Sequence, residues 1–325
     1  MASTRRVRPL SSDSIRITDP AWSRGAGASE DAEALSSPVL QAFLRDEAGS
    51  LEEVKAAWDA IVKRRMTVTG EIGAGGDYEP PVPDARATAA LVRCGQKLLE
   101  ATGNGEYAEV VERTLFNAPR GASPAPFVAG VADGAFILHQ FVAFEAETPL
   151  ARFTLEGEWT GVLRLWVEPK VSREFEVRVR IPDWAEEVST ELPGLEEEAD
   201  FEDGYAVFRK LWKAGDVLTI ELGAEPVWVE ADPRVRALLG RAALTYGPLV
   251  YGLAESPGLF SADTNALIEP VGASVLPVEG RVEVESFPDT LYAPLGTGEA
   301  RAKTVDFVPY HTAPEAEVWV RRTVA

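Results

Sequence analysis

Apolar and charged residues alternate without interruption over residues 174–181. Phe175, Val177 and Val179 occupy every second position, and Glu or Arg stands between them. A period of two predicts a strand that buries one face and exposes the other to solvent. Pro182 has no amide proton for a ladder hydrogen bond, so the strand is expected to end just before it.

The apolar period changes to three or four residues between positions 38 and 117, which predicts three or four amphipathic helices. Ser50 followed by Glu53 forms a capping box, in which two free backbone amides are satisfied reciprocally. A longer helix is expected over residues 84–102, with an aspartate as its N-cap. Residues 70–83 contain four glycines and three prolines, and they are predicted to form a loop.

From about residue 127 onward, short alternating runs are separated by glycines and prolines. This spacing is typical of β-sandwiches. The predicted fold class is therefore mixed and mainly β, with helices in front of one or two β-sandwiches. We expect an N-terminal strand and linker that pack on the β part (1–37), a reduced helical domain (38–122), a β-sandwich (123–230), and a second sandwich or a continuation of the first (231–325).

The formal net charge of the chain is −20. This charge opposes binding to nucleic acid, whose phosphates require clustered Lys and Arg. No apolar run reaches the roughly 18 residues that a membrane span needs, and no apolar stretch follows the arginines near the N-terminus. We therefore expect neither a nucleic-acid nor a membrane partner, and a cytoplasmic location. The acidic run 196–198 could bind a cation, although a solvated loop is the simpler interpretation.

Cys94 is the single cysteine of the chain. One thiol allows neither an intrachain disulfide nor a thiolate zinc cage, so no metal and no cofactor are expected. Its position along the predicted helix favours packing over a role as a nucleophile.

Several motifs follow one another along the chain, and together they resemble one family. The β part carries Arg-Ile-Pro-x-Trp at 180–184, Asp-Gly-Tyr at 203–205 and Trp-x-x-Gly-Asp at 212–216. The segments 106–117 and 240–251 add a helix motif and a strand motif in the same order. In this combination the sequence resembles glycoside hydrolase family 127, the β-L-arabinofuranosidases.

The resemblance implies an (α/α)6 barrel in front of the β-sandwiches, of which three or four helices would be only a remnant. It also implies a zinc-bound centre built from a Glu-Thr-Cys motif and a Cys-Cys-Pro-Pro segment. This sequence has Arg86 and Thr88 in place of the ligand glutamate and cysteine, and residues 118–135 contain no cysteine. We therefore predict a catalytically silent relative that binds carbohydrate or serves as a scaffold.

An active glycosidase of the β-L-arabinofuranosidase type is the alternative. The family's acid/base glutamate lies in a loop that corresponds to residues 75–79, which makes Asp77 or Glu79 the candidate catalytic acid. Glycoside hydrolysis needs two suitably spaced carboxyl groups, or one carboxyl group and another nucleophile. One acid in a loop does not meet that requirement.

The chain contains eight tryptophans, and tryptophan is a residue on which sugars can stack. Trp166, Trp184, Trp212 and Trp319 belong to strand motifs and are expected to pack in the core. Trp159 lies in a turn-like setting instead, which makes it the candidate carbohydrate-binding residue.

A third interpretation is a structural homo-oligomer. Helices that have lost their barrel neighbours should leave an apolar surface, and such surfaces usually bind a partner. Besides a carbohydrate ligand, the expected partner is therefore a second copy of the chain, in a homodimer formed through the exposed helical face.

Overall fold

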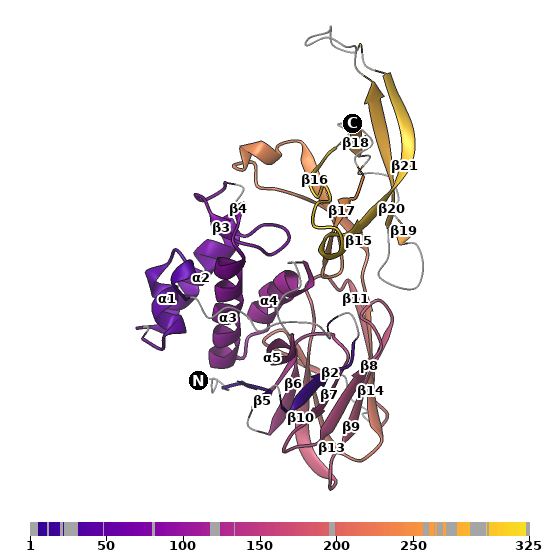
Figure 1. The fold of residues 1–325 in the computed structure, drawn as a ribbon. Helices are drawn as coiled ribbons and strands as arrows, with labels where there is room; N and C mark the ends of the chain where they lie inside the picture. The colour runs from indigo at the N-terminus through magenta and orange to yellow at the C-terminus, as the bar shows by residue number, and fades with distance from the viewer. Residues whose placement is uncertain are drawn as a thin grey trace.

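The fold places a group of helices beside three large β-sheets (Figure 1). In the computed structural model, the described residues are 6–322, except 12, 20–21, 23–31, 48, 80–81, 118–123, 133, 195–198, 256–259, 263, 265–268, 271–277, 287–296 and 298. The acidic run 196–198 lies outside the described residues.

The described residues between positions 38 and 117 form four α-helices, within the predicted number. Their ends follow the signals in the sequence. The amide of Glu53 donates to the Ser50 hydroxyl at 3.2 Å, which is one half of the capping box. Asp84 caps the third helix, and Gly103 ends it in the left-handed conformation that favours glycine (φ 71°). The helices are α1 (Pro38–Leu44), α2 (Leu51–Arg65), α3 (Ala85–Thr102) and α4 (Glu106–Asn117), with the 3-10 turn η1 (Ala32–Ala34) before them and the short α5 (Ala125–Val128) after them.

The loop between α2 and α3 holds a small two-stranded pairing of β3 (Gly73–Ala74) with β4 (Val82–Pro83). A Cβ atom on Gly73 would lie 1.7 Å from the carbonyl oxygen of Val82, so only glycine fits this close approach.

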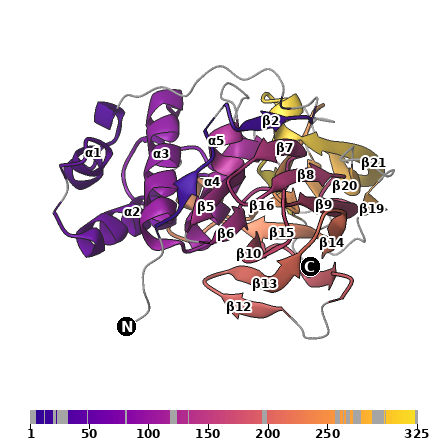
Figure 2. The ribbon, with the colours of Figure 1, turned by 90° about the horizontal axis from the view of Figure 1, so that it is seen from below.

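Two six-stranded sheets pack face to face as a β-sandwich, which Figure 2 shows in projection. The N-terminal strands divide between them: β1 pairs with β5 in one sheet, and β2 pairs with β7 in the other. In spatial order the first sheet is β1 (Arg8–Pro9), β5 (Ala129–Ala132), β6 (Ala135–Leu138), β10 (Arg173–Arg180), β13 (Tyr205–Trp212) and β12 (Asp200–Glu202). The second is β11 (Glu187–Glu191), β14 (Asp216–Gly223), β9 (Val162–Glu168), β8 (Arg152–Glu156), β7 (Phe144–Glu147) and β2 (Ile15–Ile17).

Strand β10 ends two residues before Pro182, as its sequence predicts, and it buries Phe175, Val177 and Val179 in the sandwich core. Its other face is not uniformly solvated. Arg178 and Arg180 are 6% and 1% exposed. The alternation therefore predicts the strand correctly but not the environment of its charged face, because other elements of the fold cover that face.

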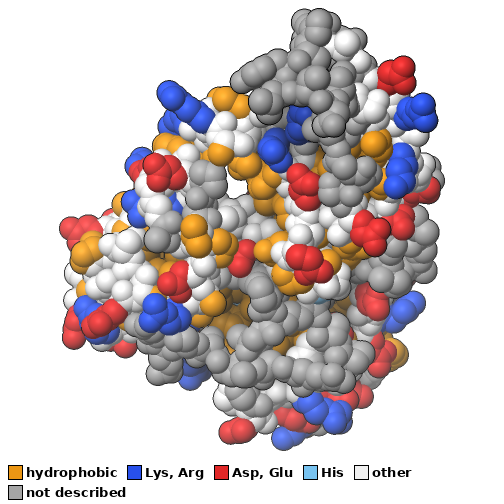
Figure 3. Space-filling view, turned by 45° about the horizontal axis from the view of Figure 1, so that its top comes forward, with side chains coloured by type: hydrophobic (Ala, Val, Ile, Leu, Met, Phe, Trp, Pro, Cys, Tyr) orange, Lys and Arg blue, Asp and Glu red, His pale blue; other side chains and the backbone are white. Residues whose placement is uncertain are grey.

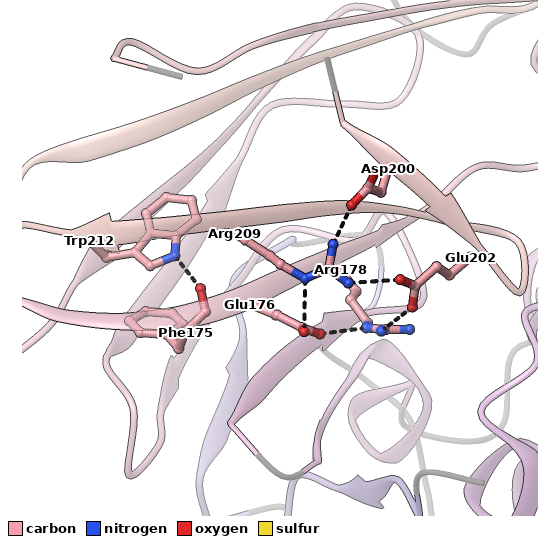
Figure 4. A network of polar contacts seen from close by, with 7 residues as sticks. All are labelled: Phe175, Glu176, Arg178, Asp200, Glu202, Arg209 and Trp212. Carbon is pink, nitrogen blue, oxygen red and sulfur yellow. Dashed lines mark hydrogen bonds and ion pairs between the residues drawn. The ribbon is translucent and has the colours of Figure 1, made fainter. Parts of the chain in front are cut away.

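Arg178 belongs to a network of charges on the outer face of the first sheet (Figure 4). It donates to Glu176 at 3.1 Å and to Glu202 at 2.6 Å. Arg209 on β13 donates to the same two carboxylates and to Asp200. These contacts link β10, β13 and the short edge strand β12, so the exposed edge of the sheet ends in a strand fixed by ion pairs.

The third sheet completes the β part and confirms the predicted fold class, which is mixed and mainly β with helices ahead of the sheets. Figure 1 shows its long β20–β21 hairpin projecting from the body of the molecule. Its strands are β15 (Pro226–Glu230), β16 (Arg241–Tyr246), β17 (Leu249–Leu253), β18 (Phe260–Ala262), β19 (Glu269–Pro270), β20 (Val278–Ser286), β21 (Glu299–Pro309) and β22 (Val320–Arg321), and the 3-10 turns η2 (Arg236–Leu238) and η3 (Tyr310–Thr312) belong to its connections.

The helices have a core of their own, centred on Leu40, Trp58, Leu91 and Leu98. Among the described residues from 32 to 117, the large apolar side chains that are exposed are Val39 and Val82. The broad apolar surface that suggested a dimer is therefore not seen on the described part of these helices, and the homodimer stays a prediction. No helix of the described residues is long and apolar enough to cross a bilayer.

Candidate functional site

Helix α4 is held against the sandwich by a buried arginine. The Arg180 guanidinium forms ion pairs with Glu109 and Glu112 of α4 and donates to the carbonyl oxygen of His139 at 2.6 Å. Trp184 donates its indole N–H to the second oxygen of Glu112 at 2.8 Å. Two charges this deeply buried are tolerated because every polar atom of the pair has a partner. The Arg-Ile-Pro-x-Trp motif therefore attaches helix α4 to the sandwich.

Burial and pairing act on Glu112 in opposite directions. Burial has the larger effect, so the pKa of the Glu112 carboxyl is raised to about 7 although the Arg180 charge opposes that rise. Both oxygens of Glu112 receive N–H donors, from Arg180 and Trp184. Both oxygens of this carboxylate are therefore engaged by side chains of the protein itself.

The far end of α4 is fixed to the third sheet by Asn117, which is fully buried. Its side-chain amide donates to the carbonyl oxygen of Pro248 at 2.8 Å and accepts from the amide of Val250 at 2.6 Å. Helix α4 thus contacts the sandwich near one end and the third sheet at the other.

A cleft of about 680 Å³ lies where the helices, the sandwich and the third sheet meet. The space-filling view in Figure 3 looks toward this side, where the surface is hollowed between the helical lobe and the β-rich lobe. Half-buried aromatic side chains line the cleft together with charged groups of both signs. Its lining comes from the end of α2 and the following loop (63–71), residues 78–79, α4 (109–113), residues 183–184, the connections of the third sheet (229–238 and 245–250), and residues 310 and 318–319.

The two acids suggested by the sequence lie in one turn but in different surroundings. Asp77 accepts hydrogen bonds from Arg65 at 2.8 Å and from Arg64 at 3.2 Å, and these bonds lower the pKa of its carboxyl group. A general acid must hold its proton, so this environment does not suit Asp77 for that role. Glu79 is exposed and lines the cleft, and its carboxylate accepts from the amide of Gly76 at 3.0 Å.

The expectation that Trp159 is exposed for ligand stacking is wrong. Its side chain is 4% exposed and packs between Trp184 and Tyr246, with ring centroids 5.3 and 5.4 Å away. It also lies against Gly247, where a Cβ atom would come within 2.3 Å of its ring. Residues distant in the sequence therefore cover Trp159, although its local sequence is typical of a turn.

The other tryptophans also differ from one another. Trp212 is fully buried as expected, whereas Trp166 is 37% exposed, so its predicted core position is wrong. Trp184 and Trp319 are only half-buried, because each lines the cleft. Two tryptophans that the sequence assigned to the core are thus within reach of a ligand in the cleft.

The positions that the family resemblance assigns to the zinc centre do not fit a metal. Arg86 is exposed and lies 3.7 Å from Asp84. Thr88 is buried, and its hydroxyl exchanges hydrogen bonds with the backbone of Ile72 at 3.1 and 3.2 Å. A guanidinium repels a cation, and a threonine occupied by the backbone supplies no thiolate. Over the described part of the chain, no group of three or more His, Cys, Asp or Glu side chains could hold a metal ion.

Cys94 is buried inside the helical core, where its thiol lies 3.8 Å from the carbonyl oxygen of Leu40. Burial raises the pKa of this thiol to about 12. Because the thiolate is the reactive form, we expect Cys94 in the folded protein to react with a disulfide reagent at pH 8 roughly a thousandfold more slowly than an unperturbed thiol. Protein unfolded in guanidinium chloride is the control, and rapid labelling of the folded protein would show that the thiol is accessible.

Glu71 is a cleft residue that the sequence did not single out. It is 9% exposed, and burial raises the pKa of its carboxyl group. The signal that could have revealed it is a lone acidic residue between Gly70 and Ile72, inside an otherwise uncharged segment.

The sandwich matches a known family. The profile of the GH127 middle domain of β-L-arabinofuranosidases covers residues 135–224, from β6 to β14, a span that contains Arg180 and Trp184. By this match, residues 135–224 resemble a GH127 middle domain. The chain is also 28% identical to the non-reducing end β-L-arabinofuranosidase of Bifidobacterium longum subsp. longum, over an alignment of 277 residues that covers 62% of the chain.

Two solved structures of GH127 enzymes have the same fold. A β-L-arabinofuranosidase from Geobacillus stearothermophilus T6 superposes with a TM-score of 0.73 and 22% identity over 88% of this chain. A second GH127 β-arabinofuranosidase gives a TM-score of 0.69 and 21% identity over 87% of this chain. The chain covers 59% and 58% of these two structures and 42% of the Bifidobacterium relative. The chain thus spans less than two thirds of the length of each of these relatives.

Proposed function

We propose that the protein binds a saccharide in the cleft and does not carry out the zinc- and cysteine-dependent chemistry that the family resemblance implies. The observation that carries this proposal is the contrast between two parts of the molecule. The cleft is wide and lined with aromatic and polar side chains, whereas Arg86 and Thr88 stand where the family resemblance implies the metal ligands.

The cleft has the chemistry that a neutral sugar requires. Trp184, Tyr310 and Trp319 present half-buried aromatic surfaces against which the C–H faces of a sugar ring can pack. Arg113 is exposed in the same cleft, and no ion pair of its guanidinium occurs among the described residues. Aromatic walls with a few polar groups that fix orientation are typical of small-molecule sites.

The test is calorimetric titration with a β-L-arabinofuranosyl disaccharide. An aromatic contact is worth about 0.5–1.5 kcal/mol, so Trp319→Ala should weaken binding up to roughly tenfold. Trp166→Ala is the matched control, since Trp166 is exposed outside the cleft, and it should bind as the wild type does. Equal affinities of the two variants would show that the saccharide does not bind in the cleft.

The alternative function, an active glycosidase, is supported by the position of Glu79 at the cleft. It is tested by hydrolysis of nitrophenyl β-L-arabinofuranoside by the wild type, Asp77→Asn and Glu79→Gln. The proposed binding function predicts no turnover by any of the three proteins. Turnover that is lost only in Glu79→Gln would establish the alternative. It would overturn the proposal that the cleft binds a saccharide without hydrolysing it.

A further inference from the structure

Glu71 stands out because its side chain is held rigidly at the wall of the cleft. The Thr69 hydroxyl donates to one carboxyl oxygen at 3.0 Å. The Thr67 hydroxyl accepts from the Glu71 amide at 3.0 Å, and the Thr67 amide donates to the Glu71 carbonyl oxygen at 2.9 Å. Contacts from two threonines thus fix the backbone of Glu71 and one oxygen of its carboxyl group, so the side chain is preorganised for a ligand.

Glu71 also has no positive partner among the described residues, in contrast to the other buried carboxylate of the cleft. Glu112 is paired with Arg180, whereas the carboxyl group of Glu71 accepts its hydrogen bond from a neutral hydroxyl, that of Thr69. A buried carboxyl group without a cation is more stable when protonated. Burial accordingly raises its pKa, and the bond from Thr69 offsets only part of that effect.

The charged and titratable groups around Glu71 do not change this conclusion. Tyr310 of η3 lies close enough for the charge of an ionised Glu71 to raise the pKa of its phenol, after the larger effect of burial. The remaining charged groups of the cleft are Lys63, Arg64 and Arg65 at the end of α2, Glu109, Glu112 and Arg113 on α4, Asp183 beside Trp184, Glu230 and Asp232 of the third sheet, and Glu79.

We propose that Glu71 is a ligand-binding residue of the cleft, which donates a hydrogen bond from its protonated carboxyl group to an oxygen of the saccharide. This inference rests on the proposed binding function. A neutral ligand that covers the cleft removes the remaining water from Glu71 and brings no cation to it. Binding therefore favours the protonated form, and the protein takes up a proton when Glu71 is ionised beforehand.

The consequence is a dependence of affinity on pH with a defined sign. The wild type should bind the β-L-arabinofuranosyl disaccharide best at acidic pH. Above the pKa of Glu71, the dissociation constant should rise by a factor that approaches roughly ten for each pH unit. Glu71→Gln keeps the shape and stays neutral, so its affinity should not change over the same range.

The experiment is titration calorimetry of the wild type, Glu71→Gln and Glu100→Gln above the pKa of Glu71, in two buffers of different ionisation enthalpy. Glu100 is a half-buried carboxyl group outside the cleft, and burial raises its pKa as well. Net proton uptake should occur in the wild type and in Glu100→Gln, and it should vanish in Glu71→Gln. Binding without proton uptake in the wild type, or equal uptake in Glu71→Gln, overturns the role of Glu71 and leaves the binding function standing. The absence of binding heat in the wild type at every pH overturns both proposals.

Discussion

Replacing Arg180 with methionine should lower the free energy of unfolding by about 3–5 kcal/mol, the cost of leaving a buried partner charge unpaired. Arg180 is 1% exposed and pairs with Glu109 and Glu112. Methionine fills much of the same volume but supplies no donor, so the buried Glu112 carboxylate loses its counter-ion. The carbonyl oxygen of His139 loses its hydrogen bond as well.

The matched control for Arg180→Met is Arg209→Met. Arg209 also contacts several carboxylates, but its side chain is 40% exposed. Water can replace the lost contacts there, so the expected loss is about 1 kcal/mol or less. Urea unfolding followed by circular dichroism measures both values. Equal losses in the two variants would show that Arg180 does not connect α4 to the sandwich.

The second large effect is expected for Trp159→Ala, which should destabilise the protein by about 3–5 kcal/mol. Trp159 is 4% exposed and fills the space between Trp184 and Tyr246. Its removal leaves a cavity directly behind Trp184, a residue that lines the cleft. The affinity for the disaccharide should therefore fall together with stability.

Trp166→Ala serves again as the comparison, because Trp166 is 37% exposed and surface substitutions usually change stability by about 0.5 kcal/mol or less. Thermal and urea unfolding of the two variants give the difference directly. If Trp159→Ala were as mild as Trp166→Ala, Trp159 would not be packed behind the cleft.

Stability should also depend on the charge of Glu71, with a sign that follows from its raised pKa. A carboxyl group whose pKa is higher in the folded state favours folding at low pH, and this contribution is lost as the pH rises through the folded-state pKa. The unfolding free energy of the wild type should therefore fall relative to that of Glu71→Gln as the pH rises above the ordinary glutamate range. Parallel curves for the two proteins would show that Glu71 is not desolvated.

Local signals in the sequence predicted the elements of the fold well. The capping box at Ser50, the cap at Asp84 and the end of β10 before Pro182 depend on residues within one turn or one strand, so they can be deduced from neighbouring positions. The fold class follows from the same periodicities, and the family from the order of the motifs.

The site was harder to predict because it depends on contacts between distant segments. Trp159 has the local sequence of a turn, but Gly247 and Tyr246 of the third sheet cover it. The charged face of β10 was expected in water, but α4 places Glu109 and Glu112 over Arg180. Glu71 becomes unusual only when Thr69 and the cleft walls surround it. A single sequence does not show which of its segments will meet.

The central claim is that the cleft binds a saccharide but does not hydrolyse it by zinc- and cysteine-dependent chemistry. The most direct test is calorimetric titration of the wild type with the β-L-arabinofuranosyl disaccharide in the presence of zinc. The contents of the calorimeter cell are then analysed by chromatography. We predict saturable binding heat and a disaccharide recovered intact. Release of free arabinose that depends on zinc and is lost in Cys94→Ser would contradict the account, and so would the absence of any binding heat.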